Sequence, residues 1–140
     1  MNKKLKDIHA RDIMVTDVIT ASPKDRIGAV DLKMVRAAIG GVPVVDRNYK
    51  LLGIITQRDI MLSRFTAQIS SSAVSDLMTH NPVTCKPGSN LEVILKKMLE
   101  NKIERLPVVD ENNKLIGLIV HTVILDKIYN SLKNNSTNSE

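Results

Sequence analysis

A gapless internal repeat with a period of 64 residues constrains this chain more than any other feature of its sequence. The triplet Asp12-Ile13-Met14 returns as Asp76-Leu77-Met78. Between residues 12–62 and 76–126, 17 of 51 aligned positions are identical, and many others exchange one apolar residue for another. Because self-similarity at a fixed period is the signature of a repeated structural unit, the chain is a duplication.

Each copy is predicted to fold as β-α-β-β-α, which places the chain in the mixed α/β (α+β) class. Short apolar runs with β-branched residues, bounded by proline or by polar turn residues, predict the strands. Three are expected in each copy, at residues 18–20, 42–45 and 51–55 and at residues 83–85, 106–109 and 115–120. Asp46 and Asp110 begin the polar turns between the last two strands of each copy.

Two helices are expected in each copy. The first carries apolar residues at helical spacing, with Asp25 as the expected N-cap in copy one and a Ser89/Glu92 capping box in copy two. The second helix begins near Thr56 in copy one and near His121 in copy two. A unit of about 55 residues with one small sheet is marginal alone, so the helix stripes of the two copies are expected to cover each other.

The domain boundaries follow from the repeat. Copy one is expected at residues 10–66 and copy two at residues 74–131, with a serine-rich linker at residues 66–75 between them. The polar residues 133–140 are expected to form a disordered tail.

Composition excludes several classes of protein. The chain has 140 residues, is 43% hydrophobic and 25% charged, and has no apolar run of membrane-spanning length. A secretory signal is not expected, and the single cysteine, Cys85, favours the reducing cytoplasm. The three histidines lack the spacing of metal ligands, and no nucleophile constellation or phosphate-binding loop is visible. We therefore expect neither a metal site nor an enzyme.

The net charge of +5 lies in the first half of the sequence. Residues 1–70 hold 12 basic and 7 acidic residues, whereas residues 71–140 hold 8 of each. An excess of this kind can attract a phosphate-bearing molecule or a nucleic acid, but the charge alone favours a solvated surface that keeps the protein soluble. Only 2% of the residues are aromatic, which disfavours base stacking on a single strand.

The repeat motifs resemble those of the tandem CBS domain, the regulatory module named after cystathionine β-synthase. The resemblance covers about residues 10–130 and rests on the DIM and DLM triplets, on GGVPVVD and ERLPVVD, and most specifically on GIITQRDI at residues 53–60. It implies two copies packed around a pseudo-twofold axis. It also implies that AMP, ADP, ATP or S-adenosylmethionine binds in clefts between the copies.

Thr56 and Asp59 are the principal candidate binding residues. A carboxylate at Asp59 can accept hydrogen bonds from both ribose hydroxyls, and the start of the last helix, with Thr56, suits a phosphate. Gly53 permits a close backbone approach. The competing interpretation is structural, because Thr-x-x-Asp is itself close to a capping box. The resemblance favours ligand binding, with capping as a possible second role.

The second copy departs from the motif, with Val120 and Val123 at the positions of Thr56 and Asp59. Valine cannot hydrogen-bond ribose, so this second cleft is expected to bind weakly or not at all. The resemblance places Val83, Ile103, Glu104 and Arg105 at the groove, with Arg105 as a candidate phosphate partner. The remaining candidates are Gly40, Gly41, Arg58 and His121, and surface positions remain an alternative for Arg58, Arg105 and His121.

The sequence therefore predicts a cytoplasmic, adenine-nucleotide-sensing regulatory module without catalysis of its own. AMP is the first expected ligand, followed by ADP or ATP and then S-adenosylmethionine, and no cofactor is required. We expect a homodimer through helix faces at Ile60, Met61, Phe65, Ile124 and Ile128, and an unidentified enzyme or transporter as partner. Two alternatives stay open: a structural adaptor with a vestigial pocket, and a nucleic-acid binder that uses the basic first half.

Overall fold

The chain is divided between two units, and neither is one continuous stretch of sequence. The computed structural model describes residues 4–65 and 72–138. Unit 1 combines Met1–Thr16, Val83–Asp110 and Ile116–Glu140, and unit 2 combines Asp17–Pro82 and Glu111–Leu115. The segment that opens each repeat therefore packs with the rest of the other repeat.

Unit 2 is built on a three-stranded antiparallel sheet. Strand β2 (Leu51–Thr56) lies between β1 (Gly41–Val45) and β3 (Thr79–His80). Ala21 adds a parallel bridge to Val44 at the outer edge of β1. The β1 and β2 predictions are confirmed to within one residue at each end, because their apolar residues form continuous or alternating buried rows.

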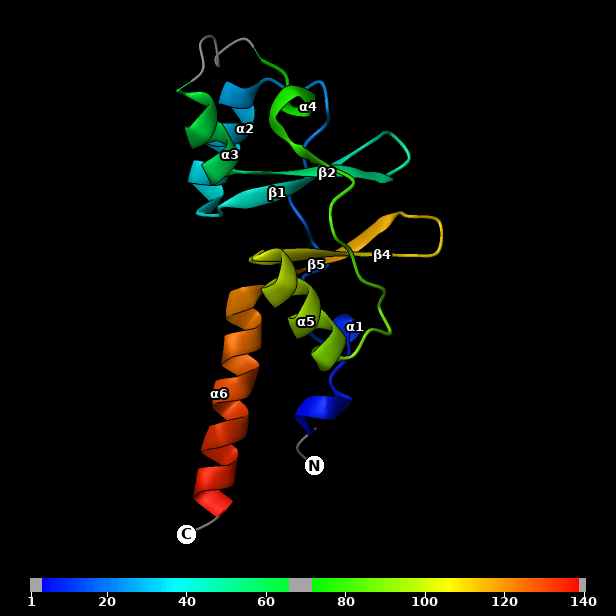
Figure 1. Cartoon of the computed structure of the whole chain (residues 1–140), viewed down its shortest axis with the longest axis vertical. Helices are drawn as coiled ribbons and strands as arrows, with labels where there is room; N and C mark the ends of the chain where they lie inside the picture. The colour runs from blue at the N-terminus through cyan, green and yellow to red at the C-terminus, as the bar shows by residue number, and fades with distance from the viewer. Residues whose placement is uncertain (1–3, 66–71, 139–140) are drawn as a thin grey trace. The chain divides into compact units, whose positions relative to one another are not determined.

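Three helices gather on one side of the β1–β2 hairpin (Figure 1). They are α2 (Ile27–Ala37), α3 (Gln57–Ser63) and α4 (Val74–Leu77). Ile27, Val30 and Met34 of α2 pack with Ile60 of α3 and Val74 of α4 in the core of this unit. The apolar stripe of α2 is thus buried within its own unit.

Unit 1 repeats this arrangement around strands β4 (Arg105–Val109) and β5 (Leu115–Val120). Cys85 forms a parallel bridge to Val108, and Val15 forms an antiparallel bridge to Leu118. The helical elements are η1 (Leu5–Asp7), α1 (Ala10–Ile13), α5 (Leu91–Asn101) and α6 (His121–Asn138).

The core of unit 1 is closed by the N-terminal segment. Ile8, Ala10 and Ile13 pack with Leu91 and Ile94 of α5. The N–H of Leu91 donates to Ile8 O at 2.9 Å, and the N–H of Ala10 donates to Ser89 O at 2.8 Å. The expected mutual covering of the two copies' helix stripes is therefore wrong: each stripe lies in its own core, and the copies exchange N-terminal segments instead.

The structure corrects the N-caps predicted for the first helix of each copy. The N-cap of α5 is Asn90, whose side chain accepts from the N–H of Val93 at 2.9 Å, while Ser89 Oγ accepts from the N–H of Lys86. Asp25 accepts from the N–H of Ser22 and stands before Arg26, the N-cap residue of α2. Short polar side chains also stabilise turns, and here that role displaces the predicted caps.

The prediction for the C-terminal residues is also corrected by the structure. Residues 133–138, expected as part of a disordered tail, continue α6 to Asn138. Helix propagation costs less than nucleation, so a formed helix extends into polar residues. The predicted linker at residues 66–75 lies largely outside the described residues, and its described end enters α4 at Val74.

Candidate functional site

Thr56 and Asp59 meet where strand β2 passes into helix α3. Thr56 Oγ1 accepts a hydrogen bond from the N–H of Asp59 at 3.1 Å. The N–H of Thr56 donates to Asp59 Oδ2 at 2.9 Å. This is a reciprocal capping box, so the structural interpretation of the motif is confirmed.

Capping engages only part of the Asp59 carboxylate. Its Oδ1 accepts no hydrogen bond from any residue that the structure describes. The side chain is half-buried and still reaches solvent. A carboxylate carries several acceptor positions on two oxygens, so one oxygen can cap the helix while the other receives donors from a ligand.

Gly40 and Gly41 border the same corner. Gly41 is paired with Thr56 across the β1–β2 ladder, and Gly40 O accepts from the N–H of Gln57 at 2.9 Å. Four of the predicted residues, namely Gly40, Gly41, Thr56 and Asp59, are therefore brought together within unit 2. Arg58, the fifth candidate in this unit, is exposed on α3.

Three N–H groups at the start of α3 are already hydrogen-bonded. The N–H groups of Thr56, Gln57 and Asp59 donate to Asp59 Oδ2, Gly40 O and Thr56 Oγ1. These groups are not free to hold an anion. Among the described residues, the N–H of Arg58 has no acceptor, so a phosphate near this corner would depend on that one N–H and on side-chain cations.

Gly53 serves packing in the structure. A Cβ added to Gly53 would lie 2.6 Å from both Met78 Sδ and Thr79 O. Real Cβ atoms do not approach other atoms this closely, so the close backbone approach predicted at Gly53 is made by the chain itself.

The matching corner of unit 1 lacks the polar pair. Val120 and Val123 are half-buried, and Val123 packs against the core of its unit. The N–H of His121 donates to Glu104 O at 2.9 Å, which repeats the Gln57–Gly40 bond 64 residues later. The backbone hydrogen bond is retained, and the Thr/Asp pair with its reciprocal capping bonds is missing. Sequence reasoning missed this carbonyl role of Gly40 and Glu104, although the repeat offset pairs the two positions.

Arg105 and His121 are the polar candidates in unit 1. Arg105 begins β4 with its side chain 19% exposed, and its Nη1 lies 4.0 Å from Glu104 Oε2, at the outer limit for an ion pair. His121 Nδ1 is buried and has no hydrogen-bond partner among the described residues. Both side chains therefore retain unused hydrogen-bonding capacity.

Val83 and Ile103 are half-buried and pack against the core of unit 1. Their packing accounts for their apolar character without any ligand. Both remain predictions as site residues.

Cys85 is a core residue. It is 2% exposed, and burial raises the pKa of its thiol to about 11, with the Lys97 ammonium acting weakly in the opposite direction. A thiol of this kind is protonated at neutral pH and is a poor nucleophile. Within residues 4–65 and 72–138, no group of three or more His, Cys, Asp or Glu side chains is placed to hold a metal ion, and none of the described helices meets the length and hydropathy needed to cross a membrane.

The basic excess is not confined to one unit. Because residues 1–16 belong to unit 1, that unit holds 11 basic and 8 acidic residues, against 9 and 7 in unit 2. The net charges are thus +3 and +2. The charge asymmetry between the two halves of the sequence does not produce one basic unit, which removes the main argument for nucleic-acid binding.

Comparison with known proteins identifies the family of both repeats. The model of the CBS domain matches residues 10–64 and 74–130. The CBS domain-containing protein YhcV of Bacillus subtilis is 36% identical over 131 residues, which cover 92% of this chain and 89% of that protein. Inosine-5'-monophosphate dehydrogenase of Methanocaldococcus jannaschii is 40% identical over 118 residues, or 84% of this chain. The chain spans only 23% of that relative.

Solved structures agree with this assignment. The CBS domain pair of protein MJ0100, in complex with 5'-methylthioadenosine and S-adenosyl-L-methionine, superposes with a TM-score of 0.81 at 27% identity. The match covers 89% of this chain and 98% of that one. CBSX2 in complex with AMP gives a TM-score of 0.79 at 27% identity, covering 87% and 96% of the two chains. With two matched repeats, a relative of similar length and the same fold, the chain belongs to the CBS domain family as a tandem CBS pair.

Proposed function

We propose that this CBS pair is a regulatory module that binds an adenosine nucleotide and has no catalytic activity of its own. The observation that carries the proposal is the Asp59 carboxylate, held by the capping box at Oδ2 and unengaged at Oδ1. The structural neighbours that hold AMP, S-adenosyl-L-methionine and 5'-methylthioadenosine support this ligand class.

Ribose recognition explains why the corner needs a fixed carboxylate. The two ribose hydroxyls are neighbouring donors, and hydrogen bonds to an ionised acceptor are the stronger kind. The capping box holds Asp59 in one orientation, so less conformational entropy is lost when the ligand binds. AMP is the first ligand to test, followed by ADP and ATP and then S-adenosylmethionine.

The decisive experiment compares Asp59→Ala with wild type by isothermal titration calorimetry against AMP. Loss of the ribose acceptor should cost about 1.5–3 kcal/mol, or roughly ten- to a hundredfold in affinity. Val123→Ala, at the corresponding position of the second repeat, should leave the affinity unchanged. Wild type should bind one AMP per chain.

Loss of the cap must be separated from loss of the ligand contact. Asp76→Ala is a matched control, because Asp76 Oδ2 accepts from the N–H of Ala73 at the start of α4 in the same way. Both variants should lower the ligand-free melting temperature, and only Asp59→Ala should lose AMP affinity. Unchanged affinity in Asp59→Ala, or two equal sites per chain, would refute this site, and the absence of binding by wild type would favour the structural-adaptor alternative.

Arg105 and His121 remain predicted phosphate contacts. Arg105→Gln should weaken binding of AMP severalfold and leave binding of adenosine unchanged, because only AMP carries the phosphate. His121→Gln should act in the same direction. Equal losses for AMP and adenosine would show that these residues affect the fold rather than the phosphate.

We also propose that the chain forms a homodimer through its exposed helix faces. The prediction that Ile60 and Ile124 lie in the dimer interface is wrong, because they are only 2% and 3% exposed and belong to the cores of their units. The exposed apolar residues of α3, of the turn that follows it and of α6 are Met61, Leu62, Phe65, Leu125, Tyr129 and Leu132. Contiguous apolar surface on a small protein commonly marks an interface.

Light scattering should give twice the mass of one chain for wild type. Phe65→Lys with Tyr129→Lys, two residues related by the 64-residue offset, should give the mass of one chain with unchanged secondary structure. A wild-type mass of one chain at micromolar concentration would refute the dimer. The regulated partner, an enzyme or a transporter, is not specified by these surfaces.

A further inference from the structure

A groove of about 620 Å³ opens within unit 1, between the N-terminal segment and helix α6. Its volume is in the range of small-molecule sites, which is about 300–1,000 Å³. Every residue that lines it lies within Lys4–Ile13 or Lys127–Asn135, so it is separate from the corner that holds Thr56 and Asp59.

The floor of the groove is rigid and apolar. Ile8 and Ile13 are 6% and 5% exposed and belong to the core of unit 1, and Leu5 packs against the same core. The N-terminal segment is tied to α5 by the bond from the N–H of Leu91 to Ile8 O. The floor is therefore fixed by the fold and offers a surface for the carbon atoms of a ligand.

The wall formed by α6 is polar. Asn130 and Ser131 lie three and four residues after Lys127, and Asn134 lies four and three residues after them, so the four residues line one side of the helix. The exposed apolar residues Leu125, Tyr129 and Leu132 lie at other positions of α6. Asn130 Nδ2 lies 3.4 Å from Asp126 Oδ2, a long contact that leaves its carbonyl oxygen unused. This face presents amide and hydroxyl groups that match a ligand carrying hydroxyls.

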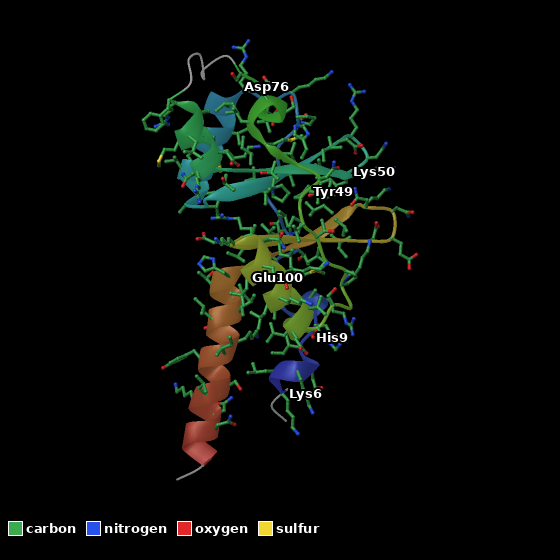
Figure 2. All side chains as sticks on the ribbon, viewed as in Figure 1. Lys6, His9, Tyr49, Lys50, Asp76 and Glu100 are labelled. Atoms are coloured by element: carbon green, nitrogen blue, oxygen red, sulfur yellow. The ribbon has the colours of Figure 1, made fainter. Side chains whose placement is uncertain are left out.

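The rim of the groove is cationic. Lys4, which directly precedes η1, and Lys6 within it line the groove together with Lys127 of α6; Lys6 is labelled on its helical turn in Figure 2. None of the three lysines forms an ion pair with an acidic residue in the described part of the chain. The one acidic side chain in the lining, Asp12, accepts from the N–H of His9 at 2.8 Å as part of the cap of α1. The side chains that line the groove therefore carry a net positive charge, which favours binding of an anion.

We propose that this groove binds a small phosphate-bearing metabolite with hydroxyl groups, such as a sugar phosphate. The lysines supply cations for the phosphate, the amide and hydroxyl groups of α6 bind the hydroxyls, and Ile8 and Ile13 contact the carbon skeleton. The site is contained in one unit and does not depend on the proposed adenosine site.

The test uses the full-length, ¹⁵N-labelled protein and glucose 6-phosphate as the probe, followed by NMR. The side-chain amide resonances of Asn130 and Asn134 should shift saturably with concentrations up to about 10 mM. The double variant Lys6→Gln/Lys127→Gln should bind at least about tenfold more weakly, since it removes two cationic contacts. Asp59→Ala should bind the probe as wild type does, which separates this proposal from the adenosine site.

The matched control is Lys24→Gln/Lys50→Gln, which removes the same charge from two exposed lysines of unit 2. It should bind glucose 6-phosphate within about twofold of wild type. The proposal is overturned by an equal loss in this control, by equal shifts with unphosphorylated glucose, or by the absence of a saturable shift at Asn130 and Asn134.

Discussion

Two residues in the left-handed backbone region end the first helix of each repeat. Ala38 has φ 55° after α2, and Lys102 has φ 53° after α5, at positions related by the 64-residue offset. Neither is glycine, although residues with a Cβ are strained in this region. Both repeats therefore end this helix in the same conformation at some cost in stability.

Lys102→Gly should stabilise the protein. Removing the Cβ relieves a strain of about 1–2 kcal/mol, offset by about 0.5–1 kcal/mol of additional backbone entropy in the unfolded state. We expect a gain of about 0.5–1 kcal/mol in the free energy of unfolding by urea denaturation. The control Lys96→Gly, inside α5, should lose about 1 kcal/mol. A loss in both variants would contradict the argument.

The buried thiol of Cys85 makes stability depend on alkaline pH. Burial raises its pKa from 9.0 to about 11, so the folded state keeps a proton that the unfolded state releases. Its contribution is complete below pH 9 and is lost as the pH rises toward 11. The melting temperature of wild type should therefore fall more steeply over this window than that of Cys85→Ala, measured by calorimetry in the same buffers. Parallel curves would show that the thiol is not responsible.

At the scale of secondary-structure elements, a glycine of one repeat packs on a methionine at the start of the other. A Cβ on Gly117 would lie 2.5 Å from Met14 Sδ, as one on Gly53 would lie 2.6 Å from Met78 Sδ. Met14 lies at the start of the first repeat and packs in unit 1, whereas Met78 lies at the start of the second and packs on β2. These contacts explain why both motifs, the DIM or DLM triplet and the central-strand glycine, occur in each copy.

Gly53→Ala should destabilise the protein by about 1–3 kcal/mol, because its Cβ meets the backbone oxygen of Thr79 as well as Met78. Gly117→Ala should cost less, because its three nearest atoms all belong to the flexible Met14 side chain. Gly28→Ala, where a Cβ meets nothing within 4 Å, is the control and should not destabilise. Urea denaturation of the three variants measures this order, and a larger loss for Gly117→Ala than for Gly53→Ala would contradict it.

At the scale of the whole molecule, the exchanged segments make the two repeats depend on each other. The fragment 1–72 contains the first repeat but lacks α4, β3 and Met78, which complete the sheet and core of unit 2. It also exposes Ile8, Ala10 and Ile13, which belong to the core of unit 1. We expect no cooperative thermal transition from monomeric 1–72.

The fragment 17–82 is the matched comparison, because it is of similar length and keeps α4 and β3 with the first repeat. Its circular-dichroism melt should be more cooperative than that of 1–72. A sharp two-state melt from 1–72 would show that segment exchange is dispensable for folding.

The sequence alone determined the duplication, the α-β-β-α order within each copy and the family, because periodicity and short motifs are local properties of the chain. The strands predicted at residues 18–20 and 83–85 were wrong, because the structure has only isolated bridges there, at Ala21 and Cys85. It also paired Thr56 with Asp59, since the two members of a capping box are only three positions apart in the sequence. The segment exchange was decided by tertiary structure: the sequence does not state which sheet Met14 or Met78 packs on, and the close approach to Gly117 and Gly53 resolves it. The same holds for the free Oδ1 of Asp59 and for the division of charge between the units, because both depend on which residues meet in space.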